Sequence, residues 1–369
     1  MQTTSRPKAW GLLVGGLFLM VPAAGVGGEV APCVVSDQLL EYAQLTRVWQ
    51  ASLPMKKGES LEAMAVLGRR LYVRSSQNYA WSFDRDNGRA VFSQPLARPG
   101  FPLLGWSAYD NQLISVIDNR LVEFDQDSGL RERVSDLELS VVAPPVRNSR
   151  FYYVSAADRR LHVLRARDMV QIFEVSAWNE SAISSILANE DEVVFGTDAG
   201  NLIAMKADAP TKLWQFDAAE AMAGPVVRDG RSFYFANKDT NVYRVDATGV
   251  GAATLVWRHQ TEAILDRPPR VTPGAVYQYA LGRGLTAIDK PSGEAIWFLP
   301  EGVDLLAETG GRAYVITKSN TLAVMDNRQG KLLYSMNLAA VIAHAANTVD
   351  GMIYIADNRG RIVCLQPVR

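Results

Sequence analysis

The stretch "AIDKPSGEAIW", residues 287–297, decides the fold because its pattern recurs along the chain. An apolar run ends at Asp289, a position that we call the marker; Gly293 follows four residues later and Trp297 four residues after that. Similar runs end at seven other markers, with successive steps of 41, 40, 41, 40, 43, 37 and 40 residues: Asp84, Asp125, Arg165, Lys206, Asp246, Asp326 and Gln366. Eight copies at so constant a period indicate an internal repeat.

An aromatic residue also recurs at a fixed distance from the marker. In the Asp246 copy an insertion moves Trp257 to eleven residues after the marker, and the Asp125 copy carries Arg133 instead of an aromatic. In the other cases the aromatic stands eight residues after the marker: Phe92, Phe173, Trp214, Trp297 and Tyr334. A glycine stands four residues after it in four copies: Gly88, Gly129, Gly293 and Gly330. Packing between stacked repeats demands such repetition, so we interpret these residues as structural rather than catalytic.

Each copy predicts four short antiparallel strands. Within residues 223–259 the runs "AGPVVRDG", "SFYFANKD", "NVYRVD" and "ATLVWRH" are rich in Val, Phe and Tyr and are bounded by turn residues. No copy has a sustained apolar period of 3.6 residues, which excludes helical repeats. Four strands in a repeat of this length are typical of a propeller blade. The sequence therefore predicts an all-β fold, an eight-bladed β-propeller of four-stranded antiparallel blades.

The marker and the glycine are expected in the hairpin between the third and fourth strands. There Asp289 can accept hydrogen bonds from turn amides, and Gly293 can adopt a positive φ. Trp297 lies on the outer strand, where its ring can pack on the neighbouring blade while its N–H needs a partner. We expect this structural motif at the following residues: Ala287, Asp289, Gly293 and Trp297, with Trp49, Trp214 and Trp257 in other copies.

The last copy predicts how the ring closes. It ends three residues after Gln366 and has no fourth strand. The segment "TRVWQASLP", residues 46–54, belongs to no blade of its own and carries Trp49, the aromatic that a fourth strand needs. We expect this N-terminal strand to complete the last blade, because joining the two ends of the chain removes open sheet edges.

The N-terminus has the pattern of an export signal. Arg6 and Lys8 precede an apolar run over residues 10–21, and small residues follow it. That run is shorter than the roughly 20 residues needed to span a bilayer, which favours cleavage. We predict a signal peptide over 1–28, an N-terminal segment over 29–44 and the propeller over 45–369. No later stretch is long and apolar enough to span a membrane.

The charge balance and the two cysteines narrow the possible partners. Lys and Arg number 38 against 39 Asp and Glu, so nothing in the charge predicts a nucleic-acid partner. Cys33 and Cys364 have no metal-ligand spacing. In an exported protein they can form a disulfide that would lock the closed ring. Lipidation of Cys33 and two free thiols remain open alternatives.

The pattern Ala-x-Asp-x-x-x-Gly-x-x-x-Trp at Ala287, Asp289, Gly293 and Trp297 resembles the tryptophan-docking motif of quinoprotein-like (PQQ-like) propellers, a family related in architecture to WD40 propellers. Within that family, the chain length, export signal, eight blades and closing strand resemble a scaffold protein of the outer-membrane β-barrel assembly machinery. The resemblance implies a monomer in the periplasm or on the periplasmic face of the outer membrane. It would be non-catalytic and bind protein partners of the cell envelope, with a β-barrel assembly protein as one candidate.

Enzymes of the same family are the alternative to a scaffold. Quinoprotein dehydrogenases typically carry adjacent cysteines near the cofactor and long insertions, and this sequence has neither. Its three histidines, His162, His259 and His344, lie in different copies, although His344 is expected on an inner strand. The sequence therefore predicts no catalytic residue, no cofactor and no metal site. A carbohydrate- or small-ligand-binding propeller and a divergent PQQ-dependent dehydrogenase remain the rival interpretations.

A binding function would lie in the loops that join one blade to the next, because function in repeat folds usually lies in such loops. Tryptophan and arginine are favoured as anchors of protein interfaces. Candidate binding-face residues in these loops are Trp106, Trp178, Glu180, His259, Arg267 and Arg270. Phe101, Lys56 and Lys57 stand in similar loops.

Overall fold

The computed structural model describes residues 33–177, 179–249 and 251–368. The signal peptide predicted over residues 1–28 lies outside the described residues. From Val34 onward the chain forms one compact unit. Its described residues contain one short helix, α1 (Asp37–Tyr42), and 32 β-strands.

The strands form eight antiparallel sheets of four, which we number as blades 1 to 8. Blade 1 consists of β2 (Leu61–Leu67), β3 (Arg70–Ser75), β4 (Tyr79–Asp84) and β5 (Ala90–Pro95), and blade 2 of β6 (Leu103–Tyr109), β7 (Gln112–Ile117), β8 (Arg120–Asp125) and β9 (Arg131–Asp136). Blade 3 consists of β10 (Val146–Arg147), β11 (Phe151–Ser155), β12 (Arg160–Arg165) and β13 (Gln171–Ser176), and blade 4 of β14 (Ile183–Ala188), β15 (Glu192–Thr197), β16 (Asn201–Lys206) and β17 (Lys212–Asp217). Blade 5 consists of β18 (Val227–Asp229), β19 (Ser232–Ala236), β20 (Asn241–Asp246) and β21 (Thr254–Gln260), and blade 6 of β22 (Arg270–Val271), β23 (Ala275–Ala280), β24 (Gly284–Asp289) and β25 (Ala295–Leu299). Blade 7 consists of β26 (Gly302–Thr309), β27 (Arg312–Thr317), β28 (Thr321–Asp326) and β29 (Lys331–Asn337), and blade 8 of β30 (Val341–Ala345), β31 (Ile353–Asp357), β32 (Arg361–Pro367) and β1 (Leu45–Ser52).

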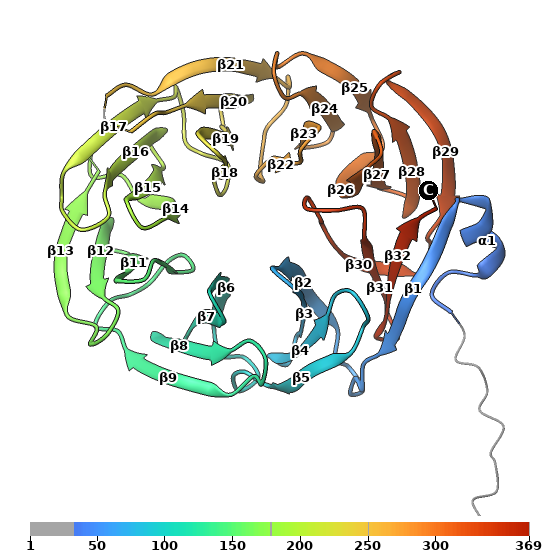
Figure 1. Cartoon of the computed structure of the whole chain (residues 1–369), viewed down its shortest axis with the longest axis horizontal. Helices are drawn as coiled ribbons and strands as arrows, with labels where there is room; N and C mark the ends of the chain where they lie inside the picture. The colour runs from blue at the N-terminus through green and yellow to red at the C-terminus, as the bar shows by residue number, and fades with distance from the viewer. Residues whose placement is uncertain (1–32, 178, 250, 369) are drawn as a thin grey trace, which may run out of the picture. The chain divides into compact units, whose positions relative to one another are not determined.

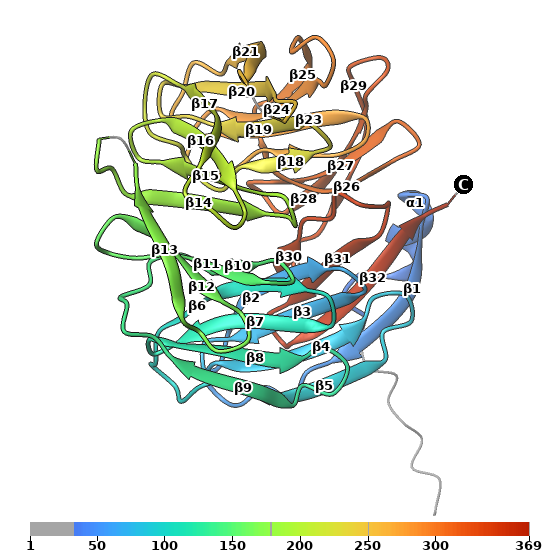
Figure 2. The ribbon, with the colours of Figure 1, turned by 60° about the vertical axis from the view of Figure 1, so that its left-hand side comes forward.

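The eight sheets are arranged around a ring, with the first strand of each blade innermost and the fourth outermost (Figure 1). Viewed obliquely, the blades remain separate sheets whose outer strands form the rim (Figure 2). In blade 8 the order is β30-β31-β32-β1, so the N-terminal strand is the outermost strand of the last blade. Both the eight-bladed propeller and its closure by an N-terminal strand are thus confirmed.

Trp257 and Trp297, two of the repeated tryptophans, bind the next blade through their indole N–H groups. Trp257 of blade 5 donates to the carbonyl oxygen of Lys290 in blade 6 at 3.0 Å. Trp297 of blade 6 donates to the Oδ1 atom of Asn327 in blade 7 at 2.7 Å. In both cases the acceptor residue directly follows the marker of the next blade. The tryptophan therefore joins two blades and satisfies its polar group in a seam that excludes water.

In blades 1, 2 and 6 the glycine of the motif makes room for the aromatic ring of the preceding blade. Gly293 has a φ of +78°, and a Cβ built there would lie 2.6 Å from the ring of Trp257. Gly88 of blade 1 is in the same relation to Trp49, with a distance of 2.5 Å. Glycine is required here by the turn conformation and by the close approach of a ring. The marker Asp289 holds the same turn by accepting from the backbone N–H of Ser292 at 3.0 Å.

A buried tyrosine recurs in the seams as a second polar contact. It stands twelve residues before the marker in six copies: Tyr72, Tyr153, Tyr234, Tyr277, Tyr314 and Tyr354. The hydroxyl of Tyr72 donates to Gln126 Oε1 at 3.1 Å, and that of Tyr153 to the carbonyl oxygen of Ala207 at 2.9 Å. Each acceptor again directly follows the marker of the next blade. Burial raises the pKa of both phenols well above its ordinary value.

The seam between blades 2 and 3 uses an arginine in place of the aromatic. The guanidinium of Arg133 donates to the carbonyl oxygen of Ala166, which follows the marker Arg165 of blade 3. Glu123 on β8 is buried behind it, with its Oε1 atom 3.7 Å from the Arg133 guanidinium and its Oε2 atom 4.0 Å from that of Arg147. Arg133 therefore occupies the docking position, and a buried carboxylate balances its charge.

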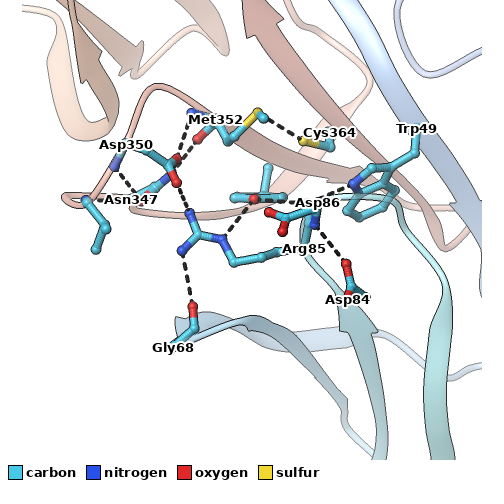
Figure 3. A network of polar contacts seen from close by, with 11 residues as sticks. Trp49, Gly68, Asp84, Arg85, Asp86, Asn347, Asp350, Met352 and Cys364 are labelled. Atoms are coloured by element: carbon cyan, nitrogen blue, oxygen red, sulfur yellow. Dashed lines mark hydrogen bonds and ion pairs between the residues drawn. The ribbon is translucent and has the colours of Figure 1, made fainter.

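The closing seam between blades 8 and 1 is built around Arg85, the residue after the first marker (Figure 3). Its carbonyl oxygen accepts the indole N–H of Trp49 at 2.9 Å. Its guanidinium donates to the Tyr354 hydroxyl at 3.2 Å, to the Gly68 carbonyl oxygen at 3.1 Å and to Asp350 at 2.5 Å. Arg85 is buried, so one side chain links both blades where the two ends of the ring meet.

The N-terminal segment takes the place of the missing hairpin in blade 8. The hydroxyl of Tyr334 in blade 7 donates to the carbonyl oxygen of Ala43, just before β1, at 2.7 Å. Val34, Val35 and Leu40 are buried in the core that blades 7 and 8 share. The aromatic of blade 7 thus finds its acceptor in this segment rather than in a hairpin turn.

Cys364 lies inside blade 8. It stands opposite Trp49 in the pairing of β1 with β32 and is fully buried, with its sulfur 3.8 Å from that of Met352. Burial raises the pKa of its thiol to about 12. Both Cys364 and Cys33 are free thiols in the structure, without the bridge that the sequence allows.

Candidate protein-binding face

One face of the propeller carries the loops between blades, and we call it the loop face. Backbone hydrogen bonds join these loops to the turns between second and third strands. Leu96 of the loop after blade 1 donates to the carbonyl oxygen of Asn78 at 2.9 Å, and Leu137 of the next loop donates to that of Asn119 at 3.1 Å. The turns that carry the markers lie at the other ends of the strands. The seams hold the blades and thereby fix the positions of the loops.

The loop between blades 5 and 6 and the adjoining β23–β24 turn of blade 6 together present an exposed apolar pair beside an arginine. Ile264 and Leu281 are 60% and 50% exposed, and the Leu281 N–H donates to the carbonyl oxygen of Ile264 at 2.9 Å. The guanidinium of Arg267 lies over the ring of Tyr279, 4.3 Å from its centroid. The sequence pattern indicated Arg267 as a binding residue but neither of the two aliphatic residues. Ile264 was marked by being an apolar side chain in a loop otherwise rich in charge and proline, and Leu281 by being an apolar side chain in a glycine-containing hairpin turn.

Arg270 lies on an innermost strand, where it forms an ion pair across blades. Its guanidinium holds both carboxylate oxygens of Asp304 on β26 at 3.0 and 2.9 Å. His344 of β30 places Nε2 3.2 Å from the same carboxylate. Burial alone would raise the pKa of Asp304, but the hydrogen bonds from His344 and Arg270 hold it far below its usual value. Arg270 is thus engaged with blade 7, and His344 lies on an inner strand as expected.

His259 and Trp106 lie in packed positions on strands rather than in loops. His259 is on β21, and its Nδ1 atom is 2.9 Å from the carbonyl oxygen of Gly293, so it lies across the seam between blades 5 and 6. Trp106 is on β6 and packs against Tyr72 of blade 1 at 5.5 Å between ring centroids. The sequence predicted both residues in loops between blades, but β6 and β21 extend through these positions.

The remaining candidates lie apart from one another on the loop face. Glu180 is exposed after blade 3, whereas Trp178 lies outside the described residues. Phe101 is 37% exposed between blades 1 and 2. Lys56 and Lys57 are exposed in the loop between blades 8 and 1. The structure thus gathers no single cluster from the predicted set.

Neither a metal-binding cluster nor a membrane-spanning helix is found among the described residues. Across residues 33–177, 179–249 and 251–368, no group of three or more His, Cys, Asp and Glu side chains is placed to hold a metal ion. In the same part of the chain, the structure contains no helix of the length and hydrophobicity that a membrane crossing requires.

Comparison with known sequences identifies a family over most of the chain. Residues 39–248 and 282–368 match the sequence model of the family described as "Outer membrane protein assembly factor BamB". No curated protein matches the sequence significantly.

Solved structures share the fold at low sequence identity. The crystal structure of BamB from Moraxella catarrhalis aligns with a TM-score of 0.65 at 14% identity, covering 87% of this chain and 99% of that one. The computationally designed Ika8 protein aligns with a TM-score of 0.64 at 13% identity, covering 85% of this chain and 98% of that one. The C-terminal WD40 domain of Sif2 aligns with a TM-score of 0.62 at 10% identity, covering 87% and 98%. Identities this low establish the fold alone.

Proposed function

This chain belongs to the family of the outer membrane protein assembly factor BamB, and from that premise we propose that it is a non-catalytic scaffold that binds a protein partner in assembly of outer-membrane β-barrel proteins. The single observation that carries the proposal is the exposed pair Ile264 and Leu281 beside Arg267 on a face whose loops the seams hold in place. Arginine is favoured among the anchors of protein interfaces, and burial of the two exposed aliphatic side chains beside it would stabilise a complex.

The rigidity of the loop face supports binding of a folded partner. A loop that is already ordered loses little conformational entropy when a partner binds. The loop between blades 5 and 6, residues 261–269, which we call the Ile264 loop, is held by the hydrogen bond from Leu281. In the same loop the Thr261 N–H donates to the carbonyl oxygen of Thr240 at 2.9 Å. Arg267 keeps its guanidinium on Tyr279. These contacts present the same surface before and after binding.

The proposed place of action is the periplasm or the periplasmic face of the outer membrane. The basic and apolar N-terminal pattern supports export, and the family is named for an outer-membrane assembly factor. The propeller closes on its own N-terminal strand, so no second copy is needed to complete a blade. We therefore propose a monomer that contacts a β-barrel assembly protein of the envelope.

Site-specific photocrosslinking in intact cells of origin tests this function. A photoreactive amino acid replaces Leu281 on the loop face or, as the control, Leu130, which is 68% exposed in a marker turn of blade 2. The expected result is that the Leu281 probe captures an outer-membrane barrel-assembly protein, identified by mass spectrometry, and that Arg267→Glu reduces the yield. The Leu130 probe should not capture it.

Other outcomes would overturn the proposal. Equal capture from both positions would mean that the loop face is not the binding surface. Capture of no protein partner, with glycan retained on the purified protein, would favour a carbohydrate-binding propeller. Retention of a quinone with oxidoreductase activity would favour a divergent dehydrogenase.

A further inference from the structure

A groove lies between blades 1 and 2 at the loop face, away from the Ile264 loop. Its volume is about 490 Å³, within the range of sites that enclose several side chains or a small ligand. Leu96, Ile117 and Val122 line it as buried apolar residues. Phe101 and Val134, at its rim, are partly exposed. The groove thus has an apolar floor that remains open to a ligand.

Three arginines surround this floor and give the groove a positive charge. The guanidinium of Arg131 donates to the carbonyl oxygen of Leu96 at 3.3 Å and has no carboxylate partner in the described part of the chain. Among the same residues Arg98 has no ion-pair partner either. Arg120 has only a distant one, Asp118, at 3.9 Å.

The only carboxylate that lines the groove among the described residues is that of Asp118. Asp136 stands opposite Arg120 in the pairing of β8 with β9, without an ion pair between them in the described structure. The arginines are therefore free to bind carboxylates of a ligand, for which the guanidinium fork is well suited.

Both walls of the groove are fixed before any ligand binds. One wall is a turn in which the Phe101 N–H donates to the carbonyl oxygen of Arg98 at 3.1 Å, with Gly100 at a φ of +81°. The buried side chain of Asn78 donates to the carbonyl oxygens of Arg98 and Phe101, both at 3.0 Å. On the other wall, the side chain of Asn119 donates to the carbonyl oxygen of Leu137 at 2.5 Å. Such preorganised walls favour a specific ligand.

We propose that this groove binds an extended segment of a partner protein in which carboxylate side chains stand next to apolar ones. The apolar side chains would occupy the floor formed by Leu96, Ile117 and Val122, and the carboxylates would pair with Arg98, Arg120 and Arg131. A walled groove suits the side chains of a peptide better than the flat surface of a membrane. The proposal goes beyond the function above, because it assigns a second site with its own ligand.

Fluorescence anisotropy with the purified protein tests the chemistry of the ligand. The probe is a fluorescein-labelled dodecapeptide in which Phe and Leu alternate with Glu and Asp. The control peptide carries Gln and Asn at the acidic positions. We expect the acidic peptide to bind on the order of tenfold more tightly than the amide peptide. Its affinity should fall as the ionic strength rises from about 0.05 to about 0.5 M.

Charge-reversal variants test the location. Arg98→Glu combined with Arg120→Glu should weaken binding of the acidic peptide at least about tenfold. Arg359→Glu, which changes an exposed arginine of the loop face in blade 8, is the matched control and should leave it unchanged. Phe101→Ala should weaken the same peptide without changing its salt dependence. All four positions are exposed, so equal thermal unfolding midpoints would show that the variants remain folded.

Three results would overturn the proposal. Equal affinity for the acidic and amide peptides would remove the role of charge. Unchanged binding in the Arg98→Glu, Arg120→Glu variant would place the peptide elsewhere. Binding to phosphatidylglycerol vesicles through the same arginines, with no peptide binding, would assign the groove to an anionic lipid. Because the assay uses purified protein and Arg267 is left intact, its outcome is independent of the photocrosslinking from the Leu281 position.

Discussion

The seam between blades 5 and 6 and the seam between blades 2 and 3 make the same contact with different side chains. In the first, the indole of Trp257 donates to the carbonyl oxygen of Lys290. In the second, the guanidinium of Arg133 donates to the carbonyl oxygen of Ala166. The acceptor follows the marker in both blades, so the position of the carbonyl oxygen is kept while the donor changes. The ring is held by a repeated backbone geometry that more than one side chain can complete.

The two solutions differ in what else they require. Trp257 fills the seam with an apolar ring and needs only the space that Gly293 leaves. Arg133 brings a charge into a partly buried place and is accompanied by the buried Glu123. A tryptophan seam therefore depends mainly on packing, whereas the arginine seam depends on a pair of charges. Removing one member of that pair leaves the other as a buried charge without its partner.

The largest expected effect comes from emptying the tryptophan seam. Trp257→Ala removes a buried ring and leaves a cavity between blades 5 and 6, so we expect a loss of about 3–5 kcal/mol in the free energy of unfolding. Trp257→Phe keeps most of the packing and loses only the hydrogen bond to Lys290, at a cost of about 1 kcal/mol. Urea unfolding followed by circular dichroism measures both. Equal losses in the Trp257→Ala and Trp257→Phe variants would show that the indole ring contributes nothing to stability beyond the hydrogen bond of its N–H.

The glycine of the same seam gives the next largest effect. Gly293→Ala adds a Cβ 2.6 Å from the Trp257 ring and strains a residue at φ +78°, so we expect a loss of about 3 kcal/mol. Gly230→Ala is the matched control, because Gly230 has a φ of +61° with open space around it. It should cost only about 1 kcal/mol, the part due to the backbone. Similar losses for the two variants in urea unfolding would show that packing of the Trp257 ring does not require the absence of a Cβ at residue 293.

The arginine seam should respond to charge rather than to volume. Arg133→Met removes the hydrogen bond to Ala166 and leaves Glu123 with Arg147 alone, so we expect a loss of about 2 kcal/mol. Adding Glu123→Gln should recover about half of it, since the buried carboxylate is then neutral while Arg147 keeps its hydrogen bonds to Gln112 and Tyr152. A double-mutant cycle from urea unfolding gives the coupling between the two side chains. Additive losses would contradict the idea that Glu123 is present for Arg133.

The repeat made the fold predictable, because each marker corresponds to one blade. The steps between markers predicted eight blades, and the unassigned Trp49 predicted the closing strand. The Arg133 seam was harder, because a comparison of side-chain types records an arginine as a missing aromatic. It does not show that both side chains place an N–H at the same point. The tyrosines twelve residues before the marker were visible in the sequence as a period, yet the acceptors of the Tyr72 and Tyr153 hydroxyls lie in the next blade.

The candidate binding residues were less predictable than the blades. Their roles depend on where each strand ends, and strand ends are the weakest part of a pattern of alternation. Arg270 stands next to prolines and reads as a loop residue, but it begins β22 and pairs with Asp304 of another blade. The groove combines Arg98, Arg120 and Arg131 from three separate segments, and nothing in the local sequence of any one of them indicates the others.

The smallest expected effect concerns the marker of blade 2 and sharpens the comparison at the level of the turn. Asp125 accepts from the hydroxyl and the N–H of Ser128 at 2.6 and 2.7 Å, and the hydroxyl hydrogen bond is the main cause that lowers its pKa below the ordinary 3.8. A carboxylate whose pKa is lower in the folded state stabilises the fold fully above its unfolded pKa, and this contribution is lost as the pH falls through the folded pKa.

Asp125→Asn keeps one acceptor oxygen for Ser128, removes the charge and puts a donor in place of the oxygen that accepts from the Asn111 side-chain N–H at 2.7 Å. We therefore expect the thermal unfolding midpoint to fall by about one degree at pH 6, because an exposed charged contact contributes little. The difference from the unaltered protein should shrink below about pH 4 and vanish near pH 2, where the aspartate is protonated as well. Melting curves across this pH range test it. A difference that stays constant with pH would show that the geometry of the turn, and not the charge of the marker, stabilises the hairpin.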